Sequence, residues 1–455
     1  MAEPSGEDLV IIGYAAETCL GDEYETFRRI MEGESSFTNL RQPGQILDGI
    51  PEEVTRAEVG GVLPEKFDPL AYEGYRDENS KILKDCYKRN RDRHRAVQIF
   101  TSLGVRALRH ANLFLEEGGR PTLTLDPTKV PDTRQIGVFA GTGIGGGTVL
   151  PYISERIRID RPTPPSVTLQ MEPERIASVL SMEVGAHGPL ATFSGACASG
   201  NMAPIFGEWA LRLNKADFMV VGGAEGAIVP EIFAAFDGMD ALDKEKDPAK
   251  ASRPFDMSRG GFVPAEGGGA IVLTKRRIAE QIGSVIHAEF IGSGLAADGY
   301  SDTEPEPKGT YAAYAMEQAM DGVVEYLNGS EAEGYVATHG TATPLGDDAE
   351  LRAMGKVETL DPEKTSVSSL KSMIGHIIGG SAAAELVVCT MVVSTYNQGV
   401  LVPPSVHIPN PDFDIIKSWR MNIGQAPEVP NLRWALNNSF GFGGYDYVDA
   451  VGAPR

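Results

Sequence analysis

Cys197 stands among small residues in the segment SGACASGN, residues 194–201, where a large substrate could reach its sulfur. The segment lies between an apolar, strand-like run and a helical pattern. Unpaired N–H groups and the dipole at a helix N-terminus stabilise a thiolate, so we expect a lowered pKa for this thiol. Most free cysteines are instead buried apolar side chains. A nucleophile and a packed core thiol both remain open, and a metal ligand is less favoured because no second thiol or histidine follows at ligand spacing.

Two of the seven histidines lie at the ends of predicted elements, in turns rich in glycine. His339 follows the strand-like run EGYVAT and precedes Thr341 and Thr343. His376 comes five residues after Lys371. A lone histidine is usually structural, and threonines in such turns often cap backbone groups. Two histidines in this setting nevertheless indicate a site in which imidazoles act together with the thiol.

A third motif, GTGIGG at residues 141–146, follows the strand-like run QIGVFAG and matches the pattern GxGxxG. This pattern is typical of dinucleotide-binding turns, but those have an acidic residue about 20 positions further on. No convincing acidic residue ends a second strand there. We therefore interpret the motif as a tight glycine turn beside an active site.

Short β-branched runs alternate with helical patterns, which predicts an α/β fold with mostly buried strands. The segment that contains Cys197 and the segment that contains His376 share one design, a strand, a turn of small residues and then a helix that is apolar on all sides. A helix of that kind is buried between layers. The sequence therefore predicts two similar halves, 1–280 and 281–455, with an inserted cap near residues 40–95.

The composition excludes several classes of protein. The net charge is −22, from 41 basic and 63 acidic residues, and binding of nucleic acid needs a basic surface. No apolar run approaches the roughly 20 residues of a membrane span, and the acidic N-terminus does not resemble an export signal. The four cysteines are widely spaced without a CxxC pair, which favours a reduced, cytoplasmic protein.

Five motifs follow one another along the chain in a characteristic order. They are GACASG, ASRPFDMSRGGFVPAEGGGAIVL, HGTATPLGDDAE, KSMIGHIIGGSAAAE and NNSFGFGG. Together they resemble the β-ketoacyl-acyl carrier protein synthases of the I/II type, the elongating condensing enzymes. The resemblance covers nearly the whole chain and implies a thiolase-like fold with five αβαβα layers built from two similar halves.

The resemblance also implies a reaction, the decarboxylative Claisen condensation of fatty acid biosynthesis. Cys197 would carry an acyl group, and His339 and His376 would hold the carbonyl oxygen of a malonyl thioester. Lys371 would support His376 and the charge balance of the site, with Glu385 as its ion partner. The product would be a 3-oxoacyl-acyl carrier protein that is two carbons longer.

Further residues match the family's binding positions. Phe442 would act as a gate, and its backbone N–H would share the oxyanion with that of Cys197. Thr341 and Thr343 would bind the pantetheine amides. Ile144 and Phe236 would line the acyl pocket, which explains the glycine turn better than a dinucleotide does.

The resemblance implies a homodimer that receives its substrates from an acyl carrier protein. No metal or cofactor is expected beyond the phosphopantetheine of that carrier. The densest basic run, YKRNRDRHR, contains Lys88, Arg89 and Arg91 and is the predicted docking surface. A solvated helix face is the simpler interpretation of that run.

The sequence alone leaves other functions open. A type II polyketide ketosynthase would use the same chemistry, a chain-length partner subunit would use none, and a cysteine hydrolase or simple acyltransferase would not decarboxylate. The chain also departs from the family, with Asp446 at a position that is usually asparagine and no histidine after the tyrosine of AADGYSDTEPEP. These departures concern substrate and partner rather than the reaction.

Overall fold

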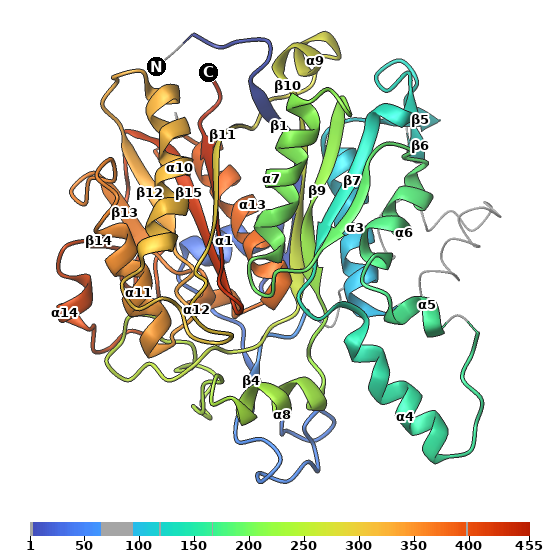
Figure 1. The fold of residues 1–455 in the computed structure, drawn as a ribbon, viewed down its shortest axis with the longest axis vertical. Coiled ribbons are helices and arrows are strands. Elements are labelled where there is room, and N and C mark those ends of the chain that lie inside the picture. Colours follow the sequence, from blue (N-terminus) through green and yellow to red (C-terminus); the bar gives the residue numbers. More distant parts are fainter. Residues whose placement is uncertain (1–2, 65–93, 118–119, 166, 397–398) are drawn as a thin grey trace.

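The computed structural model of the 455-residue chain describes all residues except 1–2, 65–93, 118–119, 166 and 397–398 (Figure 1). Its first group of strands has the order β1-β10-β9-β7-β8. In this group β7, β8 and β9 are parallel, and β10 runs antiparallel to its neighbours β1 and β9. The strands span Leu9–Thr18 (β1), Ile136–Gly141 (β7), Leu190–Phe193 (β8), Phe218–Glu225 (β9) and Gly267–Lys275 (β10).

The second group of strands repeats this arrangement, in the order β11-β16-β15-β12-β13. The strands β12, β13 and β15 are parallel, and β16 is antiparallel to β11 and β15. A short pairing of β1 with β11 joins the two groups into a 12-stranded sheet. The strands span Ala288–Ala297 (β11), Glu333–Ala337 (β12), Thr365–Ser368 (β13), Leu432–Gly441 (β15) and Tyr445–Gly452 (β16), with Arg420–Met421 (β14) at the edge and Gly21–Asp22 (β2) beside β1.

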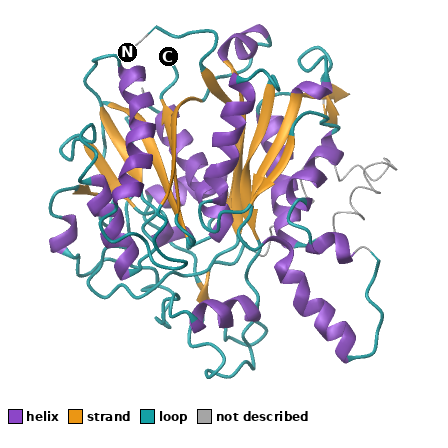
Figure 2. Ribbon diagram, in the orientation of Figure 1, coloured by secondary structure: helices purple, strands orange, loops and turns teal. Residues whose placement is uncertain are grey.

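Helices complete five layers, as Figures 1 and 2 show. The central layer contains α7 and α13, and the outer layers contain α3 with α6 on one side and α10 with α11 on the other. These helices span Arg95–His110 (α3), Arg175–Val184 (α6), Ser199–Arg212 (α7), Thr310–Leu327 (α10), Pro344–Met354 (α11) and Ser381–Ser394 (α13). The arrangement confirms the predicted αβαβα fold of two similar halves.

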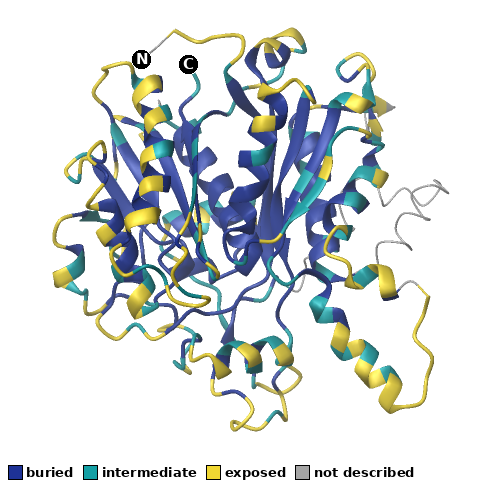
Figure 3. Ribbon diagram, viewed as in Figure 1, coloured by how far each residue is buried: buried dark blue, intermediate teal, exposed yellow. Residues whose placement is uncertain are grey.

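The burial of the central helices follows from their sequences. Every residue of α13 from Ser381 to Val393 is buried, since the segment SAAAELVVCTMVV offers no polar face to solvent. The outer helix α10 is amphipathic and turns exposed side chains outward, as the colours of Figure 3 show. This difference confirms the prediction that a helix apolar on all sides lies between layers.

The described part of the predicted cap, residues 40–64, packs beside α8 (Pro230–Gly238). Leu40, Leu47 and Ala57 share an apolar cluster there with Phe233 and Phe262.

Among the described helices, none combines the length and the apolarity that crossing a membrane requires. The remaining elements span Glu23–Met31 (α1), Thr38–Asn39 (β3), Val59–Gly60 (β4), Phe114–Glu117 (β5), Arg120–Leu125 (β6), Leu150–Arg158 (α4), Val167–Met171 (α5), Arg276–Gln281 (α9), Lys371–Ile374 (α12) and Phe413–Ile416 (α14), with 3-10 turns at Thr133–Gln135, Gly145–Val149 and Ile378–Gly380.

Candidate active site

Cys197 lies in a tight turn that joins β8 to α7. Ala196, just before it, has a φ of +49°, a left-handed conformation that non-glycine residues rarely adopt. The Ser199 hydroxyl holds this turn, since it accepts the Gly195 N–H at 2.9 Å and donates to the Ala196 carbonyl at 2.6 Å. The turn therefore presents the thiol in front of α7, where it is 7% exposed.

The structure brings three predicted groups together. The Nε2 atom of His376 lies 3.0 Å from the Sγ atom of Cys197. One ligand atom from each of Cys197, His339 and His376 falls within 4.8 Å of the other two, and the two imidazole centroids are 5.5 Å apart. Zinc bond lengths would put two tetrahedral ligand atoms roughly 3.5 Å apart, so the shorter contact of Sγ with Nε2 fits a hydrogen bond better.

The internal repeat explains this convergence. Cys197 precedes α7 and His376 precedes α13, and these are the corresponding central helices of the two halves. The two helices approach closely where they begin, because a Cβ atom on Gly200 would lie 2.7 Å from the Ala383 nitrogen. A glycine at position 200 therefore allows the two helices to approach this closely.

Burial controls the protonation of the thiol. It raises the pKa of Cys197 to about 12, although the Lys371 ammonium and the Phe442 N–H lower it. The expectation of a lowered pKa at the helix N-terminus is therefore wrong, because the cost of desolvating a thiolate exceeds the stabilisation by nearby donors and charge. The resting sulfur is a neutral thiol and needs a base to remove its proton.

The neighbouring imidazoles are neutral and can supply that base. Burial, followed by the charge of Lys371, lowers the pKa of His376 and of His339 well below the usual value. The Nδ1 atom of His376 lies 2.9 Å from the Ser381 hydroxyl, which also accepts the Ile377 N–H at 2.7 Å. A neutral imidazole next to a neutral thiol is the arrangement of a base and a nucleophile.

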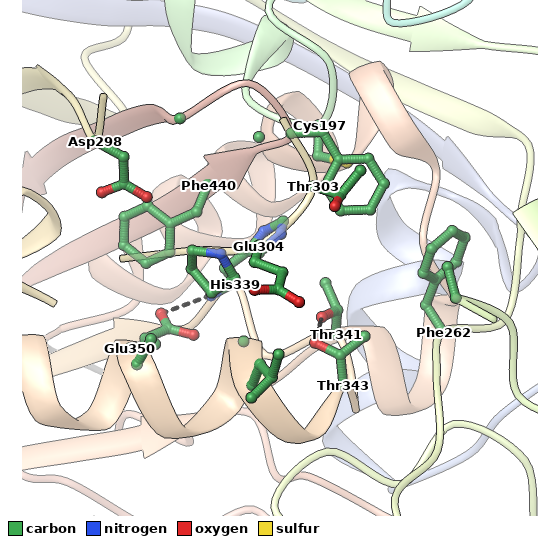
Figure 4. A pocket seen from close by; sticks show the side chains of 18 of the residues that line it. Cys197, Phe262, Asp298, Thr303, Glu304, His339, Thr341, Thr343, Glu350 and Phe440 are labelled. Carbon is green, nitrogen blue, oxygen red and sulfur yellow. Dashed lines mark hydrogen bonds between the residues drawn. The ribbon is translucent and has the colours of Figure 1, made fainter. Parts of the chain in front are cut away.

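Glu350 on α11 positions the turn that carries His339. Its carboxylate accepts the backbone N–H of His339 and that of Gly340, both at 2.8 Å, and Figure 4 draws the bond to His339. The Asn438 amide donates to the same carboxylate at 3.0 Å. The sequence analysis missed this residue, although it ends the motif HGTATPLGDDAE.

Lys371 and Glu385 form the predicted ion pair. The Nζ atom lies 2.6 Å from Oε1, and both side chains are buried. Burial raises the pKa of Glu385 to about 7, even though the ammonium of Lys371 lowers it. A pair like this is costly to break, because removing one partner leaves the other charge buried and uncompensated.

A pocket of about 300 Å³ opens onto Cys197 and both histidines. Thr341, Thr343 and Phe442 also line it (Figure 4 labels the threonines). The two threonine hydroxyls lie 3.0 Å apart and hydrogen-bond to each other. The backbone N–H of Phe442 interacts with the Cys197 thiol, and Gly443 and Gly444 follow with φ of +84° and +79°.

Ile144 and Phe236 contact an apolar cluster that contains Cys197, Ala227 and Ile378. Their role in an acyl pocket stays a prediction. Three other predicted residues, Lys88, Arg89 and Arg91, fall outside the described residues.

The glycine turn of residues 141–146 encloses a carboxylate of the chain itself. Glu225 accepts the N–H groups of Gly143, Ile144 and Gly145 at 2.7, 3.1 and 3.2 Å, and the Thr142 hydroxyl at 3.1 Å. Burial raises the pKa of Glu225, while these hydrogen bonds lower it. Backbone N–H groups of this kind would cradle a phosphate in a nucleotide-binding protein. Glu225 fills that place here, and the sequence analysis did not foresee it.

Asp446, the departure noted in the sequence, also lines the pocket, next to Asp298. Burial, followed by the charge of Asp298, raises the pKa of Asp446 to about 8. Its Oδ2 atom is buried without a hydrogen-bond partner among the described residues. Asp446 is therefore mostly protonated at neutral pH.

The chain matches known protein families and relatives along most of its length. The profile described as "Beta-ketoacyl synthase, N-terminal domain" matches residues 6–279, and that described as "Beta-ketoacyl synthase, C-terminal domain" matches residues 287–408. The 3-oxoacyl-[acyl-carrier-protein] synthase 2 of Vibrio cholerae is 34% identical over 76% of this chain and 80% of its own length. The protein of the same name from Synechocystis is 36% identical over 69% of this chain and 73% of its own length.

Solved structures share the fold. A beta-ketoacyl synthase from Burkholderia phymatum aligns with a TM-score of 0.81 and 24% identity, over 99% of this chain and 100% of its own. A type II PKS acyl-carrier protein in complex with its ketosynthase aligns with a TM-score of 0.80 and 22% identity, over 98% of this chain and 100% of the aligned chain.

Proposed function

The chain belongs to the beta-ketoacyl synthase family, and from this premise we propose that it elongates an acyl group held on Cys197 with two carbons from malonyl-acyl carrier protein. The reaction is the decarboxylative condensation of fatty acid biosynthesis, and its product is a 3-oxoacyl-acyl carrier protein. The single observation that carries the proposal for these residues is the meeting of one thiol and two neutral imidazoles in one pocket.

The first half-reaction loads Cys197. Nε2 of His376, 3.0 Å from the sulfur, takes the thiol proton while the sulfur attacks the carbonyl carbon of the acyl thioester. The backbone N–H groups of Cys197 and Phe442 stabilise the oxyanion. The carbon–sulfur bond to the carrier breaks, and the departing pantetheine sulfur receives the proton.

The second half-reaction uses both imidazoles as donors. His339 and His376 hold the carbonyl oxygen of the malonyl thioester, and loss of CO2 leaves enolate charge on that oxygen. Each donor aimed at such a charge typically lowers the barrier by about 2.7–4 kcal/mol. The carbanion attacks the acyl carbon on Cys197, the carbon–sulfur bond breaks, and the departing sulfur takes up a proton from solvent. Burial, followed by the charge of the Lys371 ammonium in the Lys371–Glu385 pair, keeps both histidines neutral.

The remaining predicted residues bind the substrate. Thr341 and Thr343 hydrogen-bond the pantetheine amides at the pocket wall, and Phe442 opens and closes over the sulfur. Ile144 and Phe236 contact the acyl chain, which is supported by their place in the apolar cluster around Cys197. No cofactor is required beyond the phosphopantetheine of the carrier.

We also propose the carrier protein as partner and a homodimer as the assembly. Strand β8 lies at an open edge of the sheet, and such edges pair readily with another strand. Three apolar side chains are exposed near this edge, Leu190 on the strand and Trp209 and Leu213 near the end of the contacting helix α7. This exposure supports a surface that a second copy of the chain covers.

The proposal also includes carrier docking at Lys88, Arg89 and Arg91 and a boundary between the two halves near residue 280. A cytoplasmic location is supported by the described cysteines, which are all free.

Mass spectrometry of the two carrier-bound reactants tests the function. The protein is incubated with acyl- and malonyl-carrier protein, and the carrier is examined for an acyl group two carbons longer with a 3-oxo group. The Cys197→Ala variant should form no acyl-enzyme and no elongated product. A series of poly-oxo chains would indicate a polyketide ketosynthase instead. Absence of product from every acyl length, with Cys197 unmodified, would indicate a partner subunit and contradict the proposal.

A further inference from the structure

The far side of the His376 imidazole is held by a serine to which the mechanism above assigns no role. Nδ1 of His376 lies 2.9 Å from the Ser381 hydroxyl, and the Ile377 N–H donates to that same hydroxyl at 2.7 Å. All three residues are buried, and Ser381 is the first residue of α13. Among the described residues, Nδ1 has no other hydrogen-bond partner.

The two half-reactions require opposite tautomers of this ring. To take the proton of the Cys197 thiol, Nε2 must carry a lone pair, so the ring proton is on Nδ1. To donate to the malonyl carbonyl oxygen, Nε2 must carry the proton, so Nδ1 is an acceptor. The hydrogen bond on one ring nitrogen sets the state of the other.

A hydroxyl can satisfy both tautomers. Its oxygen has two lone pairs and one proton, and the Ile377 N–H uses one lone pair in either state. The second lone pair accepts Nδ1–H during loading, and the hydroxyl proton is donated to Nδ1 during condensation. An N–H group or a carbonyl in this place would match one tautomer only.

We propose that Ser381 is a positioning residue that allows His376 to act as a base in one half-reaction and as a hydrogen-bond donor in the other. The inference rests on the proposed function and deepens it. During loading the thiol proton passes to Nε2 and then to the departing pantetheine sulfur, so the ring ends as it began. Between the two half-reactions the ring loses a proton from Nδ1 and gains one at Nε2 by exchange with solvent, which leaves the net charge unchanged.

Ser381→Ala should separate the two half-reactions. Without the hydroxyl, the Ile377 N–H that pointed at its oxygen remains, and this group can only donate. Nδ1 then becomes an acceptor, and Nε2 is fixed as a donor. Loading of Cys197 loses its base, while decarboxylation of the malonyl group keeps its donor.

The experiment measures the half-reactions one at a time. Loading is followed by quenched-flow mass spectrometry of the acyl-enzyme formed from acyl-carrier protein. Decarboxylation is followed as acetyl-carrier protein formed from malonyl-carrier protein in a Cys197→Ala background. We expect Ser381→Ala to slow loading by about 100-fold or more, the usual contribution of a general base, and to leave decarboxylation unchanged.

Two further variants control the result. Ser381→Thr keeps the hydroxyl and should restore loading. Ser372→Ala removes a buried hydroxyl that, among the described residues, bonds only backbone groups, the Ser369 carbonyl and the Val406 N–H. It should leave the ratio of the two rates as it is in the wild type. If thermal melting shows that Ser381→Thr is misfolded, the ratio of loading rate to decarboxylation rate in Ser381→Ala alone tests the inference.

Two results would overturn the inference. One is an equal loss of both half-reactions in Ser381→Ala, which would mean that the serine only packs the ring. The other is loading at the wild-type rate. Neither result concerns the proposed function, whose failure would be seen as the absence of both half-reactions in the unmodified protein.

Discussion

The carboxylate of Glu225 should be essential for the shape of the acyl pocket, and Glu225→Gln tests this. Its Oε2 accepts the N–H groups of Gly143 and Ile144, and its Oε1 accepts the Gly145 N–H and the Thr142 hydroxyl. A glutamine has one carbonyl oxygen, so its NH2 group must face at least one of these backbone N–H groups in either orientation. Each buried donor left unpaired costs about 1–3 kcal/mol.

This magnitude gives two measurable effects. The free energy of unfolding in urea should fall by about 1–3 kcal/mol. Ile144 lies in the same turn and contacts the cluster beside Cys197, so the loosened turn should weaken acyl binding. If the whole free-energy cost of the unpaired donor weakens acyl binding, KM for a long-chain acyl substrate rises by about 5- to 150-fold.

The matched control is Glu325→Gln, the same chemical change at an exposed position of α10. It should leave both the unfolding curve and KM as they are in the wild type. Unfolding is measured by circular dichroism, and KM by the rate of acyl-enzyme formation with long and short acyl groups. Wild-type stability together with wild-type KM in Glu225→Gln would refute the reasoning, because the turn would then hold without its carboxylate.

Three further predictions concern other parts of the site. His339→Ala should lower kcat for condensation by about 100- to 1000-fold, the effect of one lost oxyanion donor, and a loss below tenfold would contradict its role. Asp446→Asn should stabilise the protein at pH 8 more than at pH 5, measured by thermal melting. Burial and Asp298 raise the pKa of Asp446 to about 8, so the wild-type protein loses stability as the pH rises toward that value, and a constant difference would contradict this. Lys88→Glu with Arg91→Glu should raise KM for carrier-bound acyl groups more than for a small thioester mimic, and equal effects would remove the docking proposal.

The layers and the family could be predicted from the sequence, because both follow from local patterns. A helix such as α13 is apolar on all sides, so it had to lie between layers, and the structure confirms this. The motifs around Cys197, His339 and His376 occur in the order and with the residues typical of the family. The profile matches confirm the resemblance that these motifs indicated. The roles of those residues stay predictions until the half-reactions are measured.

The supporting contacts could not be predicted in the same way. Glu225 lies 80 to 82 positions from the residues whose N–H groups it accepts, and no spacing rule connects them. The pKa of Cys197 was misjudged because the sequence reveals a helix N-terminus but not the loss of water around the sulfur, and this loss determines the sign. Nothing in the sequence separates Ser381 from the other small residues of its motif. Its role is indicated only by the short distance from its hydroxyl to Nδ1 of His376.

The close approach of α7 and α13 at Gly200 has a consequence for how such an enzyme can diversify. The gap between these two helices works as a fixed spacer between nucleophile and imidazole, and Gly200 holds it through close contacts with the Ala383 nitrogen and the Ala382 methyl group. Selection can therefore reshape the outer loops and the walls of the acyl chamber without moving the reacting atoms. A side chain added at the spacer would change the chemistry for every substrate at once.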